Sequence, residues 1–194
     1  RILIADDHAI VRAGLRQFIS DQPDMEVAGE AATGSEAIAL VRAGQFDVVL
    51  LDISMPDKNG IDTLKTLRQL RPELPVLMLS GYAEDQYAVN LLRGGAAGYL
   101  NKEAASTQLV GAIRTVVRGR KFVSPALAQI LADGVTGDAD RPLHAELSQR
   151  EFQIFCKLAA GAAVSKIADE LFLSVKTVST YRTRVLEKMG MKSN

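Results

Sequence analysis

The chain has 194 residues, of which 23 are basic, 23 are acidic and 47% are hydrophobic, and it contains one cysteine. This composition is typical of a globular protein and excludes fibrous, collagen-like and fully disordered chains. No aliphatic run is longer than five residues, far short of the roughly 20 that cross a bilayer, so we expect no membrane contact. A single thiol cannot form an internal disulfide, and residues 1–5 show no secretory signal. Both observations favour a cytoplasmic protein.

Five short aliphatic runs recur at intervals of about 25 residues in the first two thirds of the chain. They are residues 2–4, 25–28, 48–51, 76–79 and 96–100. Between them, apolar residues return every three or four positions, which is typical of helices. Each interval holds one strand, one helix and two turns, so the pattern predicts a parallel five-stranded sheet with helices on both faces. The second run alternates with charged residues, and we expect it at an edge of the sheet.

The sequence changes character after Phe122. Ser124 and Pro125 predict the start of a short helix over residues 126–132. Residues 133–145 contain two glycines, three aspartates and a proline, which indicate a linker. We therefore predict two domains, residues 1–122 and residues 146–194, joined by a linker with a short helix at residues 123–145.

The last segment predicts three helices. Ser148 and Glu151 form a capping box before the first helix, and Gly161 ends it. The apolar side of this helix consists of Phe152, Phe155, Leu158 and Ala159. The second helix and the turn after it carry Ile167, Ala168, Leu171, Phe172 and Leu173. Ser174 caps a third helix that runs to Gly190, and two short helices joined by a tight turn are typical of a helix-turn-helix.

Polar side chains follow four of the five predicted strands. Asp6 and Asp7 come after the first, Asp52 after the third, Ser80 after the fourth and Lys102 after the fifth. Because the carboxyl ends of parallel strands meet at one edge of the sheet, we expect these side chains to lie together. Three carboxylates repel one another unless a cation lies among them, and oxygen ligands suit Mg²⁺. A single aspartate after a strand is usually a turn former, but the ordered placement on four strand ends argues for a shared site.

Such a site can carry out phosphoryl transfer. A carboxylate beside Mg²⁺ can attack phosphorus and form an aspartyl phosphate. Mg²⁺ and the ammonium group of Lys102 would neutralise charge on the transferring group, and the hydroxyl of Ser80 could contact a phosphoryl oxygen.

Four motifs stand in order along the first 120 or so residues: Asp6-Asp7, residues 50–56 with Gly60, residues 80–82 and residues 95–102. In this order and spacing they resemble the receiver domain of two-component signalling. The resemblance implies a flavodoxin-like, doubly wound five-stranded parallel sheet with strand order 2-1-3-4-5. It also implies that Asp52 accepts a phosphoryl group from a histidine kinase.

The resemblance implies further roles at the same site. Mg²⁺ would be held by Asp7, Asp52 and the main-chain carbonyl of Ser54, with Asp6 beside it. The residues implied in contacting the phosphoryl group or in switching are Ser80, Tyr99 and Lys102. Moving a two-state equilibrium from 1:99 to 99:1 needs about 5.5 kcal/mol, which is demanding for one new group. We therefore expect phosphorylation to act partly through homodimerisation.

Positive charge gathers near the C-terminal end. Residues 175–194 hold five basic side chains and one acidic side chain, as expected of a segment that binds a polyanion, although a solvated helix face would look the same. In the third predicted helix, the core stripe consists of Val178, Tyr181, Val185 and Met189. Polar and basic residues lie mainly away from it, namely Lys176, Ser179, Thr180, Thr183 and Arg184, with Arg182 at its edge. Short polar side chains can approach base edges, and Lys and Arg can hold phosphates.

Four segments of the last domain, residues 147–151, 166–171, 174–180 and 186–189, resemble the LuxR-type helix-turn-helix. With the receiver, the whole chain resembles a NarL/FixJ-type response regulator. The resemblance implies that the third helix enters the major groove of double-stranded promoter DNA at inverted half-sites. It implies base contacts from Ser179, Thr180 and Thr183, and phosphate contacts from Lys176, Arg182 and Arg184. The family has a fourth helix after residues 192–194, so we expect this end of the chain to be truncated.

Two other functions remain open. A metal-dependent phosphatase of the haloacid dehalogenase type also forms an aspartyl phosphate, but it favours an Asp-x-Asp motif where this chain has Asp52-Ile53-Ser54, and no cap domain is evident. A receiver with a protein-binding output would contact no DNA. The favoured prediction is a phosphorylation-controlled transcription regulator rather than an enzyme.

Overall fold

The computed structural model describes residues 1–81, 86–136, 147–171 and 173–191. The chain forms two compact units, residues 1–128 and residues 129–194, and each is described on its own. Within the described residues, none of the helices combines the length and the apolar character needed to cross a membrane.

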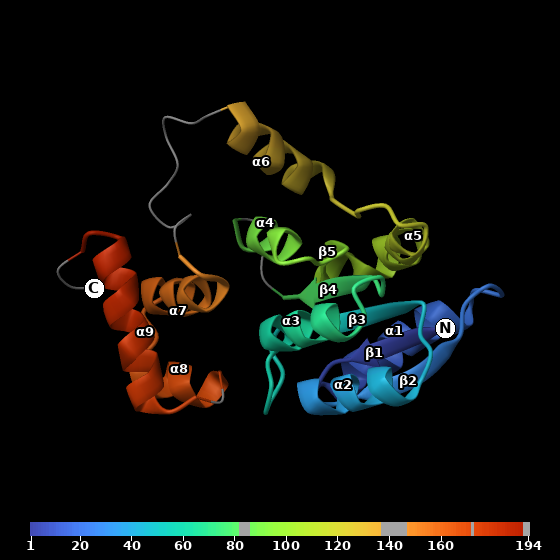
Figure 1. The fold of residues 1–194 in the computed structure, drawn as a ribbon, viewed down its shortest axis with the longest axis horizontal. Helices are drawn as coiled ribbons and strands as arrows, with labels where there is room; N and C mark the ends of the chain where they lie inside the picture. Colours follow the sequence, from blue (N-terminus) through green and yellow to red (C-terminus); the bar gives the residue numbers. More distant parts are fainter. Residues whose placement is uncertain (82–85, 137–146, 172, 192–194) are drawn as a thin grey trace. The chain divides into compact units, whose positions relative to one another are not determined.

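The first unit is built on a five-stranded sheet in which all neighbouring strands are parallel (Figure 1). The strand order is β2-β1-β3-β4-β5, as predicted. The strands are β1 (Ile2–Ala5), β2 (Val27–Ala31), β3 (Val48–Asp52), β4 (Val76–Ser80) and β5 (Gly98–Asn101). The three central strands are buried along their whole length, which explains why their sequences are almost wholly apolar.

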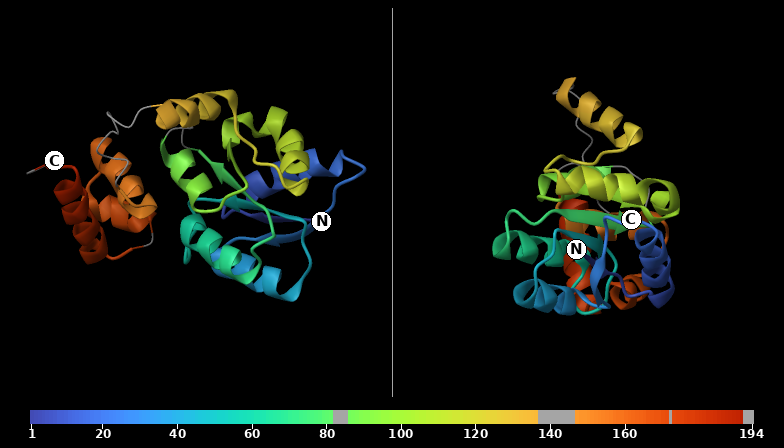
Figure 2. Two further views of the ribbon diagram at one scale, coloured as in Figure 1. Left: turned by 45° about the horizontal axis from the view of Figure 1, so that its top comes forward. Right: turned by 90° about the vertical axis from the view of Figure 1, so that its right-hand side faces the viewer.

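Helices cover both faces of this sheet (Figure 2). They are α1 (Ala9–Ser20), α2 (Gly34–Ala43), α3 (Gly60–Leu70), α4 (Gln86–Arg93) and α5 (Ala105–Val117), and a short 3-10 turn (Lys102–Ala104) precedes α5. On one face, α1 and α5 share a core cluster with β1, β3 and β4. On the other face, α2 and α3 pack together, and α4 packs against β5. The predicted doubly wound architecture is confirmed.

The edge strand β2 differs from its prediction in extent. It spans Val27–Ala31 rather than residues 25–28, although the expected edge position is confirmed. Pairing with β1 continues to Ala31 through Gly29 and Glu30. Neither of those two residues is aliphatic, so the aliphatic run locates only the start of the strand.

The chain returns to the outer edge of β5 after α5. Phe122 forms an isolated parallel bridge with Gly98, and its N–H donates to the carbonyl oxygen of Ala97 at 2.9 Å. A Cβ atom at Gly98 would lie 2.8 Å from the Cβ atom of Phe122. Only glycine permits this close approach of two chain segments.

The helix that follows Ser124 is longer than predicted. α6 spans Pro125–Thr136, and the hydroxyl oxygen of Ser124 accepts a hydrogen bond from the N–H of Leu127 at 3.1 Å. Residues 133–136 extend the helix into the predicted linker. Adding residues to an existing helix is easy, and even an interior glycine costs only about 1 kcal/mol relative to alanine. Residues 137–146, which hold the rest of that linker, lie outside the described residues.

The second unit contains three further helices: α7 (Gln149–Ala159), α8 (Val164–Glu170) and α9 (Val175–Lys188). Their shared core consists of Ile154, Ile167, Ala168, Leu171 and Val178. The predicted capping box is present, because the carboxylate of Glu151 accepts the N–H of Ser148 at 2.7 Å while the Ser148 hydroxyl accepts the N–H of Glu151. The hydroxyl of Ser174 accepts the N–H of Thr177 at 3.0 Å, and it caps α9 as predicted.

The buried side of α7 differs from its prediction at one end. Ala159 is exposed, whereas Ile154 is fully buried. Ala159 is the last helical residue, and the chain turns away at Gly161, whose φ of 79° ends the helix as predicted. Phe172 of the predicted turn and residues 192–194 lie outside the described residues.

Candidate functional site

The carboxyl ends of β1, β3 and β5 bring four charged side chains together. Asp6 directly follows β1, Asp52 is the last residue of β3 and Lys102 directly follows β5. Asp6 and Asp52 are 0% and 2% exposed, and Asp7 is half-buried. We call these four residues the acidic pocket. Because the strands are parallel, these residues meet where the carboxyl ends of the strands lie side by side.

The ammonium group of Lys102 lies between two carboxylates. Its Nζ atom is 2.7 Å from Oδ2 of Asp6 and 3.0 Å from Oδ1 of Asp52. Burial opposes the charged amine, but the negative charges of Asp52 and Asp6 raise the pKa of Lys102 above its ordinary value. Lys102 is therefore held positive, and its charge offsets part of the repulsion between the carboxylates.

Asp52 has one carboxylate oxygen that no described group satisfies. Burial raises the pKa of Asp52 to about 6, against the charge of Lys102, which lowers it. Among the described residues, the Oδ2 atom of Asp52 has no hydrogen-bond partner. One ligand atom from each of Asp6, Asp7, His8 and Asp52 lies within 4.8 Å of the others. The pocket could therefore bind a metal ion, which would satisfy this buried oxygen.

The loop after β3 is held closely against the backbone of Asp52. Gly60 opens α3, and its N–H donates to the carbonyl oxygen of Ile53 at 2.9 Å. A Cβ atom at Gly60 would lie 2.0 Å from the carbonyl oxygen of Asp52, so a larger residue would displace the end of the strand. Asn59 caps α3 by accepting the N–H of Asp62 at 3.0 Å. These contacts fix the backbone that carries Asp52.

The other predicted residues of this site lie on the neighbouring strands or in the loop. Ser80 ends β4 and is 1% exposed, and Tyr99 in β5 is fully buried. In the sheet register, Ser80 lies beside Asn101, the residue before Lys102. Ser54 lies two residues beyond Asp52 and is half-buried. Their roles remain predictions.

Two residues at the pocket carry little signal in the sequence. The Nδ1 atom of His8 lies 2.7 Å from Oδ1 of Asp7 and 3.3 Å from Oδ1 of Asp6. The guanidinium of Arg12 donates to the main-chain carbonyl oxygen of Asp6 at 2.7 Å and to Glu30 on β2 at 3.2 Å. An Asp-Asp-His run could have indicated His8. Arg12 could not be found in that way, because its partner is a backbone atom that the fold brings near.

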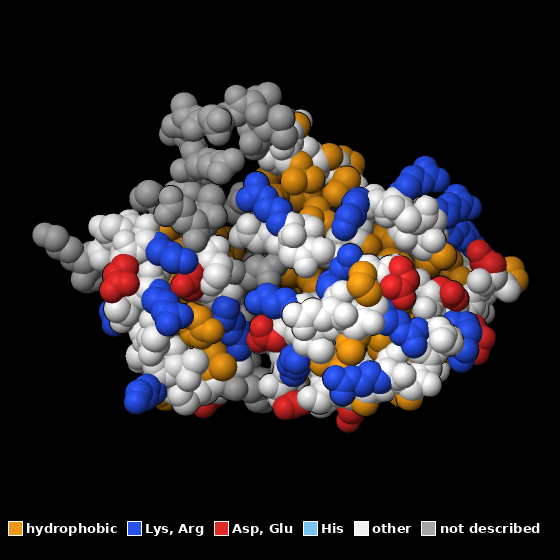
Figure 3. Space-filling model, viewed as in Figure 1, with side chains coloured by type: hydrophobic (Ala, Val, Ile, Leu, Met, Phe, Trp, Pro, Cys, Tyr) orange, Lys and Arg blue, Asp and Glu red, His pale blue; other side chains and the backbone are white. Residues whose placement is uncertain are grey.

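A second candidate surface lies on α9. Val178 and Val185 are buried, and Tyr181 and Met189 are half-buried, which agrees with the predicted core stripe. The side chains expected to contact DNA are exposed at Lys176, Ser179, Thr180, Thr183 and Arg184, and half-buried at Arg182. Figure 3 shows basic side chains interspersed with acidic ones over the helices of this unit.

Contacts within α9 orient several of its exposed side chains. The hydroxyls of Thr180 and Thr183 donate to the carbonyl oxygens four residues earlier, at 3.0 and 3.1 Å. Their acceptor lone pairs and methyl groups remain for an external partner. The guanidinium carbon of Arg184 lies 5.9 Å from the centre of the Tyr181 ring, within the range of a cation–π contact.

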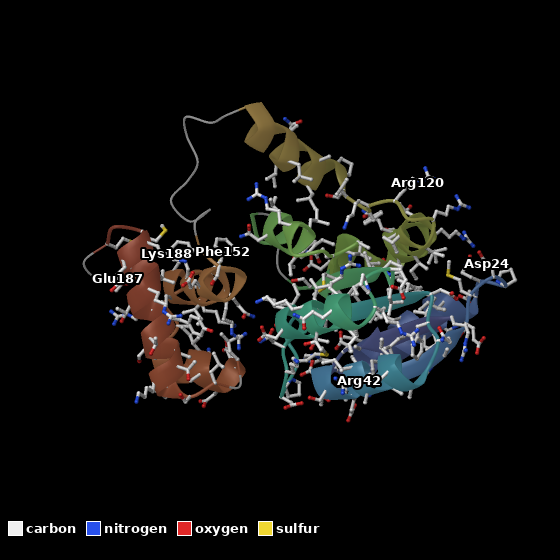
Figure 4. All side chains as sticks on the ribbon, viewed as in Figure 1. Asp24, Arg42, Arg120, Phe152, Glu187 and Lys188 are labelled. Carbon is white, nitrogen blue, oxygen red and sulfur yellow. The ribbon has the colours of Figure 1, made fainter. Side chains whose placement is uncertain are left out.

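An ion pair joins the end of α9 to the start of α7. The Nζ atom of Lys188 lies 2.7 Å from Oε2 of Glu151. Figure 4 shows Lys188 where α9 meets α7, close to Phe152. Because Glu151 also belongs to the capping box, one carboxylate connects both helices.

Two family models match this chain. Residues 2–114 match the response regulator receiver domain, and residues 145–194 match the luxR family of bacterial regulatory proteins. Together the two matches cover both units of the structure.

Curated relatives are similar to this chain over almost its whole length. The response regulator UvrY of Escherichia coli strain K12 is 35% identical over 191 residues, which cover 98% of this chain and 88% of the relative. The response regulator GacA of Pseudomonas aeruginosa is 37% identical over 196 residues, which cover 100% and 91%. The oxygen regulatory protein NreC of Staphylococcus carnosus is 36% identical over 200 residues, which cover 100% and 92%.

Solved structures agree with these relatives. RcsB of Salmonella enterica serovar Typhimurium, bound to promoter rprA in the presence of the phosphomimetic BeF₃⁻, has a TM-score of 0.71 and 26% identity, covering 100% of this chain and 93% of that chain. An RcsB–DNA complex has a TM-score of 0.73 with the same identity and coverage. Proteins of this family regulate transcription by binding DNA and are not enzymes. This chain is therefore a two-component response regulator of the NarL/FixJ family, with a receiver domain and a LuxR-type DNA-binding output.

Proposed function

We propose that Asp52 accepts a phosphoryl group from a histidine kinase. The observation that carries this proposal is the position of Lys102 between Asp6 and Asp52, beside the unsatisfied Oδ2 atom. An oxygen of Asp52 attacks phosphorus, the bond from phosphorus to the kinase imidazole breaks, and the imidazole nitrogen keeps the electron pair. The ammonium of Lys102 stabilises the charge on the phosphoryl oxygens.

The residues of the pocket fit Mg²⁺ as the cofactor. The carboxylates of Asp7 and Asp52 and the main-chain carbonyl oxygen of Ser54 would hold it, with Asp6 beside them. Bound there, Mg²⁺ would neutralise negative charge on the phosphoryl oxygens. The clustering of carboxylate oxygens around a buried, unsatisfied oxygen supports this assignment.

The switch consists of Ser80, Tyr99 and Lys102. From the end of β4, the hydroxyl of Ser80 would contact a phosphoryl oxygen. Lys102 would exchange one of its carboxylate contacts for a contact with a phosphoryl oxygen. Tyr99, which is buried in β5, would change its packing and thereby transmit the conformational change. Since one phosphoryl group supplies only part of the free energy needed to move a two-state equilibrium, we propose that phosphorylation also favours a homodimer.

The output is sequence-specific binding of α9 in the major groove of promoter DNA at inverted half-sites. Ser179, Thr180 and Thr183 would face the bases. Lys176, Arg182 and Arg184 would contact phosphates. In this proposal residues 1–122 form the receiver, residues 123–145 the linker and residues 146–194 the DNA-binding domain of a cytoplasmic regulator.

Labelling from a small phosphodonor tests the phosphoacceptor. With acetyl phosphate and Mg²⁺, we expect the wild-type chain to incorporate phosphate and Asp52→Asn to incorporate none. Asp21→Asn, at an exposed aspartate, is the matched control and should label normally. Unchanged labelling of Asp52→Asn would refute the assignment, and turnover of many phosphomonoesters would support a phosphatase instead.

A salt titration of DNA binding tests the output. We expect Lys176→Ala with Arg184→Ala to weaken binding and to lower the slope of log affinity against log salt by about 2, because two phosphate contacts are lost. The control pair is Arg42→Ala with Arg120→Ala, two exposed arginines far from α9 in the sequence and labelled in Figure 4. A slope that is unchanged in the α9 variant, or a partner that is bound without salt dependence, would favour a protein-binding output.

A further inference from the structure

His8 places an imidazole nitrogen at the acidic pocket, and the proposed phosphoryl transfer does not use it. Its Nδ1 atom lies 2.7 Å from Oδ1 of Asp7 and 3.3 Å from Oδ1 of Asp6. The pocket therefore offers nitrogen as well as oxygen to a bound ion.

These atoms lie near enough to one another to bind one ion, because one ligand atom from each of Asp6, Asp7, His8 and Asp52 lies within 4.8 Å of the others. Two ligands held roughly 2.1 Å from a metal at octahedral or tetrahedral angles are about 3.0 to 3.4 Å apart. The distance of 3.3 Å from Nδ1 of His8 to Asp6 lies in this range, whereas the distance of 2.7 Å to Asp7 is shorter and is a direct contact between the two side chains. Small shifts of exposed His8 and half-buried Asp7 would allow both to bind the same ion.

An independent observation indicates a cation at this point. The Oδ2 atom of Asp52, on a side chain only 3% exposed, has no hydrogen-bond partner among the described residues. Lys102 already contacts the other oxygen of Asp52 and one oxygen of Asp6. The atoms that Lys102 does not contact include Oδ2 of Asp52, Oδ1 of Asp7 and Nδ1 of His8, and an added cation would replace the direct contact between the last two.

We infer that His8 is a metal ligand that makes the acidic pocket a site for transition-metal ions of the Zn²⁺ class, in competition with Mg²⁺. Mg²⁺ is bound through oxygen, whereas Zn²⁺, Co²⁺ and Ni²⁺ take imidazole nitrogen together with carboxylate oxygen. Both kinds of ion require Asp7 and Asp52, so they exclude one another. The inference rests on the proposed metal site and identifies a second class of ion that occupies it, which would slow phosphorylation by displacing Mg²⁺.

Metal titration of the chelator-treated, full-length chain tests this inference. Isothermal titration calorimetry should show that His8→Ala weakens Zn²⁺ binding by about 100-fold, the upper end of what even outer-shell changes cost metal sites, and changes Mg²⁺ binding less than about twofold. The His8 side chain is 62% exposed, so we expect the variant to fold. The sequence has two histidines, and His144→Ala is the matched control that should leave both affinities unchanged.

Nitrogen NMR of histidine-labelled protein supplies a direct readout. Zn²⁺ should shift the Nδ1 resonance of His8, while Mg²⁺ should not. A Zn²⁺ affinity that does not depend on His8, or an equal loss of both metals in His8→Ala, would overturn the inference.

The labelling experiment with Asp52→Asn separates this inference from the proposed function. If the wild-type chain incorporates phosphate at Asp52 but His8→Ala keeps its Zn²⁺ affinity, only the inference fails. If Zn²⁺ binding depends on His8 but Asp52 is never labelled, only the phosphoacceptor assignment fails.

Discussion

Each unit of this protein contains a buried carboxylate, and the pKa values of the two are shifted in opposite directions. Asp52 in the receiver is 2% exposed and Glu151 in the helical unit is 4% exposed. Burial would raise the pKa of Glu151, but hydrogen bonds from Lys188 and Ser148 lower it below its ordinary value. At Asp52, burial dominates and the pKa rises to about 6 in spite of Lys102. Glu151 has partners that compensate for its burial, whereas one oxygen of Asp52 has no hydrogen-bond partner in the part of the chain that the structure describes.

This difference separates a structural carboxylate from a reactive one. Glu151 accepts the N–H of Ser148 and the ammonium of Lys188, both at 2.7 Å. Its charge stabilises the fold. Asp52 is left with an unsatisfied oxygen that a cation or a phosphoryl group can use, at a cost to the stability of the ligand-free receiver.

Removing the charge of Asp52 should produce the largest effect. The pKa of Asp52 rises from an ordinary 3.8 to about 6 on folding, so the folded receiver binds this proton more tightly than the unfolded chain. The free energy of unfolding therefore falls as the pH rises from about 4 to above 6. We expect Asp52→Asn to raise the free energy of unfolding at pH 7 by up to about 3 kcal/mol, as measured by urea denaturation.

Two comparisons check the origin of that stabilisation. The gain should shrink as the pH falls toward 4 and disappear below about pH 3, where Asp52 is protonated in both states, and Mg²⁺ should stabilise the wild-type receiver more than the variant. Asp21→Asn should change little at either pH. A stabilisation that persists unchanged at pH 4 would contradict the assignment to the charge of Asp52.

Removing the charge of Glu151 should have the opposite sign. Glu151→Ala removes the capping box and the ion pair between Glu151 and Lys188, so we expect the helical unit to lose about 2 kcal/mol. Glu151→Gln keeps the cap and should lose about half as much. Hydrogen exchange of the amides in α7 and α9 measures this loss, with Lys166→Met, which removes an exposed lysine, as a control. Equal stability of Glu151→Ala and wild type would contradict the structural role.

The pH dependence of the two units should diverge. The pKa of Glu151 is lowered by Lys188 and Ser148, so its stabilisation is present above its ordinary value of 4.5 and is lost as the pH falls below it. Protonation of Asp52 stabilises the receiver mainly at higher pH, as the pH falls from above 6 to about 4. Acid titration with residue-resolved hydrogen exchange should therefore show the receiver gaining protection from this group first, and the helical unit weakening at lower pH. A parallel response of the two units would contradict the comparison.

The smallest test concerns a neutral cap in the helical unit. Ser174 accepts the N–H of Thr177 at the start of α9, so Ser174→Ala should cost about 1 kcal/mol at every pH. Exchange of the first-turn amides of α9 measures the loss, and Ser179→Ala, farther along the helix, should leave them nearly unchanged. A loss that varied with pH between 5 and 8 would argue against a purely neutral contact.

Much of the receiver could be predicted because strand burial and strand order leave local signals. Fully apolar runs mark β3 and β4, and Asp52 and Lys102 stand directly at strand ends. The extent of β2 could not be predicted in this way, because Gly29 and Glu30 join the sheet through backbone pairing and not through apolar side chains. The length of α6 was missed for a similar reason, because residues 133–136 are helical only as an extension of a stronger helix.

The contacts at the sites also differ in whether the sequence could predict them. Caps such as Ser148 and Ser174 involve residues three apart, so sequence spacing reveals them. The bridging of Asp6 and Asp52 by Lys102, and the bond from Arg12 to a backbone carbonyl, join residues that only tertiary structure brings together. Sequence reasoning could name all four members of the acidic pocket, but not the neighbouring Arg12, and it could not show which oxygen of Asp52 would lack a partner among the described residues.

The return of Phe122 to the outer edge of β5 has a consequence for how this protein behaves at high concentration. A bare strand edge invites another molecule to add its own strand, which is a common route to aggregation. Here the chain's own bridge from Phe122 to Gly98 occupies part of that edge, and at the opposite end of the sheet Glu30 on β2 is paired with Arg12 and Arg16. Intermolecular growth of the sheet is thus opposed by backbone at one edge and by charged side chains at the other.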